Sequence, residues 1–307
     1  MRLLPAIPAA VFVLVTLGGC ATVQMRIDDV KPSCGADRPF VEGSERATLW
    51  IRTSAEFRSS AEGSYRSALL GLQVGLADTG WSAEPAQTGE FSGLPPAIVM
   101  DIDDTVLDNS AAQAQMLLAT ACPGDFDVLW DSWIAERAAP AVPGAVEFIR
   151  SAREMKDARG RQVRVFLITN RACGARPGGT SACPQQDDTL ANLRALGLDT
   201  VALEDDLMLR GEQAEWGNEK LPRRQLIAHQ YRIVLNIGDD LADFIADTRG
   251  KSPAEREQAR CRNRDWWGAR WFMIPNPMYG SWQRALGSDL DMALAQPLIP
   301  VNCDDAG

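Results

Sequence analysis

The stretch PAIVMDIDDTVLDN, residues 96–109, decides the fold of this chain. Residues 97–100 are apolar, partly β-branched and introduced by two prolines, which predicts a short buried strand. Four aspartates follow within eight residues, beginning with Asp101 and Asp103. Ligands of an open α/β sheet bind at the carboxyl ends of its strands, so we expect these acids to face a crevice. Because four acids would repel one another in a dry crevice, we expect a bound cation to hold them together.

The same aspartates are open to other roles, namely a helix N-cap, a solvated turn or a calcium loop of the EF-hand type. The calcium loop fails on detail, because Val106 stands at its sixth position instead of glycine and Ala112 at its twelfth instead of glutamate. For catalysis, the alternating spacing of Asp101 and Asp103 sends their side chains in different directions. One of them can then attack a substrate while the other transfers protons.

Polar side chains also follow a second apolar run, residues 163–168. Thr169, Asn170 and Arg171 supply a hydroxyl, an amide and a guanidinium, all of which can donate to the oxygens of a phosphate. A helix N-cap at Thr169 is the alternative.

Positive charge precedes a further apolar run, residues 233–237. Lys220, Arg223 and Arg224 fall at the start of a predicted helix, where cations are disfavoured. This local cost indicates an anionic partner nearby, and three solvated side chains are the alternative.

The run at residues 233–237 ends much as the first one does. Gly238 permits a sharp turn, and Asp239, Asp240 and Asp243 follow it. Carboxylates are therefore expected at the ends of two different buried strands.

The rest of the chain divides into segments of different pattern. An apolar stripe over residues 50–76 predicts a helix packed on the core, and strands are expected at 200–203 and 271–274. An insertion that leaves the sheet after the first strand can return over the crevice as a lid. The expected organisation is a signal segment (1–20), a tether (21–43), a helical segment of a small lobe (44–92), a core (93–286) with a helical insertion at about 110–160, and a tail (287–307).

The composition suits a globular protein and restricts its partners. The chain has 307 residues, 46% of them hydrophobic, and a formal net charge of −10. This acidic balance argues against a nucleic-acid polymer as partner. Small anionic substrates remain compatible with it where local positive groups or a metal counter the field.

The first 20 residues resemble a secretion signal, with Arg2 before a mostly apolar run that is short for a membrane span. They end in Leu17-Gly18-Gly19-Cys20, which resembles the bacterial lipobox, in which the cysteine is lipidated. The alternative is an ordinary cleaved signal with an incidental cysteine. By resemblance to the sorting pattern after a lipobox, we expect a lipid anchor at Cys20 in the outer membrane.

Six further cysteines remain in the exported chain, and an even number in an oxidising compartment predicts disulfides. The sequence does not reveal their pairing, although Cys173 and Cys183 are the nearest pair. Zinc is not expected, because the chain has no C-x-x-C pair and His229 is its only histidine.

Taken together, these motifs resemble the haloacid dehalogenase (HAD) superfamily of phosphotransferases. More narrowly, they resemble the class C acid phosphatases, which are bacterial outer-membrane lipoproteins with 5′-nucleotidase activity. The resemblance implies an α/β fold, a HAD-like doubly wound parallel sheet with a small helical cap lobe. The matching segments are 101–109, 141–148, 169–171, 238–244 and 279–282.

The resemblance also implies roles for four aspartates. Asp101 would be the nucleophile that forms an aspartyl-phosphate, and Asp103 the acid and base that serves both displacements. Mg²⁺ would be held by the Asp101 carboxylate, the Asp103 backbone carbonyl and Asp239, with Asp243 acting through water. A hard cation suits such an oxygen-only site.

Further residues are assigned to the substrate in the same way. Thr169 and Lys220 match positions that hold the phosphoryl oxygens, with Asn170 beside them. Arg223 or Arg224 is the alternative to Lys220. Trp130 and Tyr279 match aromatic positions that sandwich a nucleobase or another flat leaving group. The loop between Cys173 and Cys183 is not part of the family pattern.

The resulting prediction is a magnesium-dependent phosphomonoesterase for small-molecule phosphomonoesters, among them nucleoside 5′-monophosphates and aromatic phosphate esters. One alternative is a phosphotransferase with the same intermediate, and another is a non-catalytic surface-binding lipoprotein. The sequence leaves a homodimer open.

Overall fold

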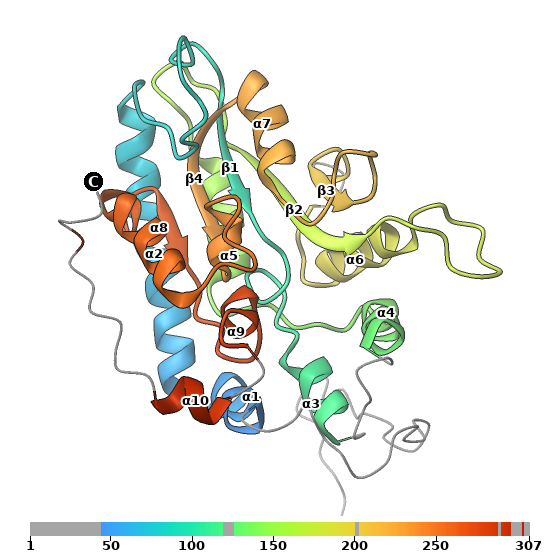
Figure 1. Ribbon diagram of the computed structural model, residues 1–307. Helices are drawn as coiled ribbons and strands as arrows, with labels where there is room; N and C mark the ends of the chain where they lie inside the picture. The colour runs from blue at the N-terminus through green and yellow to red at the C-terminus, as the bar shows by residue number, and fades with distance from the viewer. Residues whose placement is uncertain (1–43, 119–125, 200–202, 288–289, 296–302, 304–307) are drawn as a thin grey trace, which may run out of the picture.

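The computed structural model describes residues 44–118, 126–199, 203–287, 290–295 and 303. In these residues a parallel five-stranded sheet carries helices on both faces (Figure 1). Along the chain the elements are α1 (Ser44–Thr53), α2 (Ala55–Ala77), β1 (Pro96–Met100), α3 (Ser110–Leu118), α4 (Phe126–Glu136), α5 (Ala145–Glu154), β2 (Arg164–Ala172), α6 (Pro184–Ala195), β3 (Leu207–Arg210), α7 (Leu221–Gln230), β4 (Arg232–Gly238), η4 (Leu241–Asp243), α8 (Pro253–Arg262), η5 (Arg264–Trp266), β5 (Trp271–Met273), α9 (Ser281–Arg284) and α10 (Leu290–Ala295).

The sheet is doubly wound, as the sequence predicts. Its strand order is β3-β2-β1-β4-β5, so the chain moves outward from β1 on one side and then returns to the other side through β4. The order reverses between β1 and β4. In such sheets the crevice for ligands lies outside the carboxyl ends of the strands at the reversal.

Alternating side chains of β1 serve two separate cores. Ile98 and Met100 join a cluster with residues of α2, α5 and α6, while Ala97 and Val99 join one with Ile227 of α7. All five residues of β1 are buried, which is typical of a central strand in a parallel sheet. This rigid double layer fixes the residues that follow β1.

The predicted amino-terminal helix is two helices. Ser54 separates them, because its side chain caps α2 by accepting from the backbone N–H of Phe57 at 3.1 Å. Within α2 the predicted apolar stripe is buried and includes Phe57, Tyr65 and Leu72.

The third strand lies later in the chain than the prediction of residues 200–203. Leu203 is buried but precedes a turn, in which the Asp206 N–H donates to its carbonyl at 3.0 Å. The strand is β3, and it pairs with β2 from Leu207 onward. Two short apolar runs stand close together here, and the pairing with β2 selects the second; residues 200–202 lie outside the described part.

The insertion after β1 contains α3, α4 and α5. Figure 1 shows α3 and α4 beyond the carboxyl end of β1, whereas α5 packs back against α2 and the sheet. The division of the chain into a core and a small lobe stays a prediction.

Disulfides are present, as predicted. The described bonds join Cys173 to Cys183 and Cys261 to Cys303. Cys34, Cys122 and the lipobox cysteine Cys20 lie outside the described residues. Among the described helices, none has the length and apolar character that crossing a membrane would require.

Candidate active site

Three carboxylates converge where β1 and β4 end. Asp101 follows β1, and Asp239 and Asp243 follow β4; one oxygen from each lies within 4.8 Å of the other two. The Asp101 N–H donates to the Ile237 carbonyl at 2.9 Å, which extends the pairing of the two strands to the site. A set of carboxylate oxygens with no sulfur or nitrogen ligand is the kind that Mg²⁺ prefers. These residues therefore form a donor set that suits a hard divalent cation.

The turn after β4 depends on Gly238, for a reason that differs from the predicted one. A side chain at this residue would collide with the Asp243 carboxylate. The Asp243 Oδ2 atom accepts from the backbone N–H groups of Asp239 at 3.2 Å and Asp240 at 3.0 Å. The glycine thus provides space for a carboxylate that folds back onto its own loop.

Burial disfavours the ionised form of the clustered carboxylates. Burial raises the pKa of Asp101 to about 6, and Lys220 limits the rise. Burial, with the charges of Asp101 and Asp243, raises the pKa of Asp239 well above its usual range. A cluster of this kind needs a positive partner to hold all its carboxylates ionised.

Lys220 supplies one fixed positive charge within the cluster. Its Nζ atom donates to Asp101 Oδ1, and lies 2.7 Å from Asp243 Oδ1. Burial alone would lower the pKa of Lys220, but the charges of Asp101 and Asp243 outweigh burial and raise it. The predicted phosphate ligand therefore lies directly beside the predicted nucleophile.

Asp103 points to different partners from those of Asp101. Its Oδ1 atom accepts from Arg171 Nε at 3.0 Å, Arg171 Nη2 at 2.8 Å and Asn109 Nδ2 at 3.0 Å. Its Oδ2 atom accepts from Thr169 Oγ1 at 3.0 Å. Arg171 is buried and also donates to Thr189 Oγ1 at 2.9 Å. The sequence placed Arg171 at the correct strand end, but it did not indicate that Asp103 is its partner.

Asn170 turns toward the segment before α7. Its Nδ2 atom donates to the Asn218 carbonyl at 3.1 Å, and its Oδ1 atom accepts from Arg223 Nη2 at 3.0 Å. These contacts link the end of β2 to α7, and a role in phosphate binding stays a prediction.

Arg223 and Arg224 hold the backbone of the loops around the site. Arg223 Nη1 donates to the Thr169 carbonyl at 2.7 Å, and Arg224 Nη1 donates to the Asp243 carbonyl at 2.7 Å. Arg224 also pairs with the buried Glu84 at 2.7 Å. Both arginines are buried, and their hydrogen bonds to backbone carbonyls support these loops.

The loop after β1 is fastened from three sides. Asp104 adopts a left-handed conformation (φ 58°), and its carboxylate accepts from the Tyr279 hydroxyl. Thr105 Oγ1 donates to Asp239 Oδ1 at 3.2 Å. The Tyr65 hydroxyl of α2 donates to the Thr105 carbonyl. The sequence indicated Tyr65 only as part of an apolar stripe, so this support was missed.

The two predicted aromatic residues come from different sides of the site. Tyr279 lies in the loop after β5, with its hydroxyl on Asp104; burial and the Asp104 charge raise its pKa well above the usual range. Trp130 lies on α4 and stacks on Phe126, with ring centroids 6.1 Å apart. Trp133 of the same helix donates to Asn109 Oδ1 at 2.8 Å. That bond places α4 beside the loop after β1.

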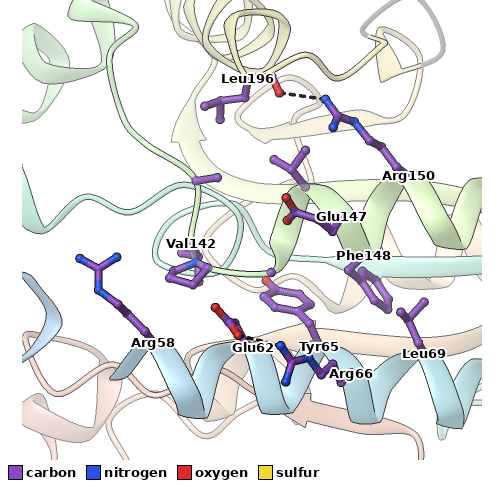
Figure 2. Close-up of a pocket in the computed structure, with 14 residues that line it drawn as sticks. Arg58, Glu62, Tyr65, Arg66, Leu69, Val142, Glu147, Phe148, Arg150 and Leu196 are labelled. Atoms are coloured by element: carbon purple, nitrogen blue, oxygen red, sulfur yellow. Dashed lines mark hydrogen bonds and ion pairs between the residues drawn. The ribbon is translucent and has the colours of Figure 1, made fainter. Parts of the chain in front are cut away.

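A separate groove of about 670 Å³ lies between α2 and α5. Figure 2 shows Tyr65 and Phe148 in its wall with Arg58, Glu62 and Arg66 around them. None of the converging carboxylates lines it. The candidate active site is therefore the cluster at the strand ends and not this groove.

Comparison with known proteins gives concordant results. The family described as HAD superfamily, subfamily IIIB (acid phosphatase) matches residues 81–282. A crystal structure of the class C acid phosphatase from Bacillus anthracis with tungstate bound is 31% identical, with a TM-score of 0.62, and the match covers 80% of this chain and 88% of that one. A second structure of that enzyme is 30% identical, also with a TM-score of 0.62, and covers 81% of this chain and 90% of the other.

Proposed function

Because the chain belongs to subfamily IIIB of the HAD superfamily, the acid phosphatases, and is a phosphomonoesterase, we propose that its substrates are nucleoside 5′-monophosphates and aryl phosphates. The proposed reaction requires magnesium and proceeds through an aspartyl-phosphate. The observation that carries this proposal is the convergence of Asp101, Asp239 and Asp243, two of which, Asp101 and Asp243, pair with Lys220.

The magnesium ion would be held by the carboxylates of Asp101 and Asp239 and by the backbone carbonyl of Asp103, with Asp243 acting through water. When bound, it offsets the negative charge of the nucleophile and the phosphate. The oxygen-only donor set and the raised pKa of Asp101 and Asp239 support this assignment.

Asp101 and Asp103 divide the covalent chemistry. An Asp101 oxygen forms a bond to phosphorus while the bond from phosphorus to the leaving oxygen breaks, and the Asp103 proton passes to that oxygen. A water molecule then attacks the aspartyl-phosphate and gives its proton to Asp103. Phosphate leaves, and both carboxyl groups return to their first state.

Lys220 and Thr169 would hold the transferring phosphoryl group. Lys220 donates to Asp101, so a phosphoryl group bonded to Asp101 would lie within its reach, and Thr169 donates to the neighbouring acid Asp103. Trp130 and Tyr279 would stack on the leaving group, and stacking favours flat groups over alkyl ones.

The test is release of phosphate from a nucleoside 5′-monophosphate, an aryl phosphate and glycerol 2-phosphate, with magnesium or with a chelator. We expect release that needs magnesium and that D101N lacks. Release that persists in the chelator, or that D101N retains, would overturn the mechanism. An added alcohol acceptor distinguishes the phosphotransferase, because it would yield a phosphorylated alcohol in place of free phosphate.

The location of the enzyme is a separate proposal. We propose a lipid anchor at Cys20 in the outer membrane, supported by the lipobox at residues 17–20. In cells fed labelled palmitate, wild type should carry the label in the outer-membrane fraction and C20S should not. Equal labelling of both proteins would contradict the anchor.

A further inference from the structure

The loop between β2 and α6 is closed by the disulfide between Cys173 and Cys183. Its first half-cystine is tied to the sheet, because the Cys173 N–H donates to the Arg210 carbonyl at 2.7 Å. The Ala172 N–H donates to Gln185 Oε1 at 2.8 Å, which ties the start of α6 to the end of β2. The backbone of this loop is therefore held in place at both ends, next to the sheet and to α6.

Arg176 is the residue that this loop presents to α4. Its Nε and Nη2 atoms bind the two carboxylate oxygens of Asp131 at 2.7 and 2.8 Å. Its Nη1 atom binds Asp188 Oδ2 of α6 at 2.7 Å. Hydrogen bonding by Arg176 lowers the pKa of Asp131, so the pair stays ionised. A bidentate contact of this kind fixes orientation as well as distance.

Two further contacts hold α4 on the same side. Gln185 Nε2 donates to Asp131 Oδ1 at 2.9 Å. Arg137, the residue after α4, donates through Nε to Asp188 Oδ1 at 2.7 Å. The Asp188 carboxylate thus accepts from Arg137, directly after α4, and from Arg176 in the disulfide-closed loop.

The other side of α4 reaches the predicted catalytic acid. Trp133 donates to Asn109 Oδ1 at 2.8 Å, and Asn109 Nδ2 donates to Asp103 Oδ1 at 3.0 Å. Trp130 therefore lies on a helix held between the loop after β1 and the disulfide-closed loop. Asp131, the residue that Arg176 binds, is its neighbour in the chain.

We propose that Arg176 is a positioning residue that sets the selectivity of the enzyme for substrates with a flat leaving group. This inference rests on the proposed function. It adds that the ion pair between Arg176 of the disulfide-closed loop and Asp131 fixes the position of Trp130. Loosening this pair lets α4 move, which weakens stacking on the leaving group and leaves the phosphoryl chemistry in place.

The experiment measures kcat and KM of the full chain for a nucleoside 5′-monophosphate and for glycerol 2-phosphate. We expect R176Q to raise KM for the nucleotide about fivefold, with less than a twofold change for the alkyl ester and in either kcat. D131N should have the same effect, and R176Q/D131N should be no worse than either single variant.

Matched controls separate positioning from general loss of structure. Arg161 is equally exposed, and its Nε and Nη2 atoms both bind Asp157 Oδ2 before β2, so R161Q should leave both KM values unchanged. C173S/C183S should reproduce R176Q, whereas C261S/C303S should not. If R176Q fails to fold, R176K, which keeps the charge but loses the fork, serves as the second variant and should raise the nucleotide KM by a smaller factor.

An equal rise in KM for both substrates, or no rise for either, would overturn the inference while leaving the proposed function intact. Wild type that releases no phosphate from any substrate would instead overturn the proposed function. The two failures are therefore distinct.

Discussion

Asp101 lies in surroundings that penalise the charge it needs for attack on phosphorus. Its carboxylate is buried beside Lys220 and close to Asp239 and Asp243. Burial raises its pKa to about 6, and Lys220 offsets only part of that rise. At this residue the requirements of chemistry and of stability oppose each other, as is typical of active sites.

This opposition predicts a pH dependence of stability in protein freed of metal. The pKa of Asp101 is about 6 in the folded state and 3.8 in the unfolded state, so the folded state binds the proton more tightly. The free energy of unfolding then falls as pH rises between these values, by about 3 kcal/mol in all. Between about pH 4 and pH 7, wild type should lose about that much more stability than D101N, measured by urea unfolding with a chelator.

Magnesium provides the control for this comparison. At neutral pH the ion should stabilise wild type more than D101N, because it binds the folded site through the carboxylate that the variant lacks. Equal loss of stability in the two metal-free proteins would contradict the account of Asp101.

At the scale of elements, the positive charges at the start of α7 show which contacts a local sequence pattern predicts and which it does not. Its positive charges predict an anionic partner, and Lys220 does face two carboxylates. Arg223 and Arg224 instead donate to backbone carbonyls of the neighbouring loops. The carbonyl partners are set by the tertiary fold, so a sequence pattern at one helix terminus does not reveal them.

The buried pair of Arg224 and Glu84 predicts a large effect on stability. Both side chains are 2% exposed, so R224M leaves the Glu84 charge without its partner. We expect R224M to lower the free energy of unfolding by about 3 to 5 kcal/mol. R224M/E84L should recover part of the loss, because it removes the uncompensated charge but not the loss of the Arg224 bonds to the Asp243 and Phe244 carbonyls. Urea unfolding measures both, and a double variant no better than R224M would contradict this explanation.

The helix α2 precedes the segment that matches the family, residues 81–282, yet it supports the candidate active site. Tyr65 donates to the Thr105 carbonyl in the loop after β1. Y65F should lower stability by about 1 to 2 kcal/mol, because a buried carbonyl loses its donor, and it should also lower kcat.

Tyr231 provides a matched control for Y65F. Its hydroxyl accepts from Arg164 at the start of β2, the end of the strand opposite to the candidate active site. Y231F should change stability without changing kcat. If Y65F leaves kcat at the wild-type value, α2 does not support catalysis through this bond.

At the scale of the whole molecule, the sequence predicts the parts whose cause is local. Apolar runs followed by carboxylates placed β1 and β4 correctly, and the reversal of strand order brings Asp101 and Asp239 together. The third strand was misplaced because two short apolar runs look alike until one pairs with β2.

What the sequence could not predict depends on contacts between distant segments. Arg171 and Asp103 are 68 residues apart, and Tyr65 and Thr105 are 40 apart. Arg176 reaches Asp131 across 45 residues. No periodicity or short motif predicts such pairs, because each forms only when the sheet and its helices have packed.

The central claim is that Asp101 becomes phosphorylated, and trapping of that intermediate tests it most directly. In D103N, an aryl phosphate with a good leaving group should still phosphorylate Asp101, because departure of that group needs little acid catalysis. Hydrolysis of the aspartyl-phosphate should be slow, because water lacks its base. Acid quenching and peptide mass spectrometry should find one phosphoryl group on Asp101 in D103N and none in D101N/D103N. A phosphoryl group on another residue, or the same adduct in the double variant, would contradict the account.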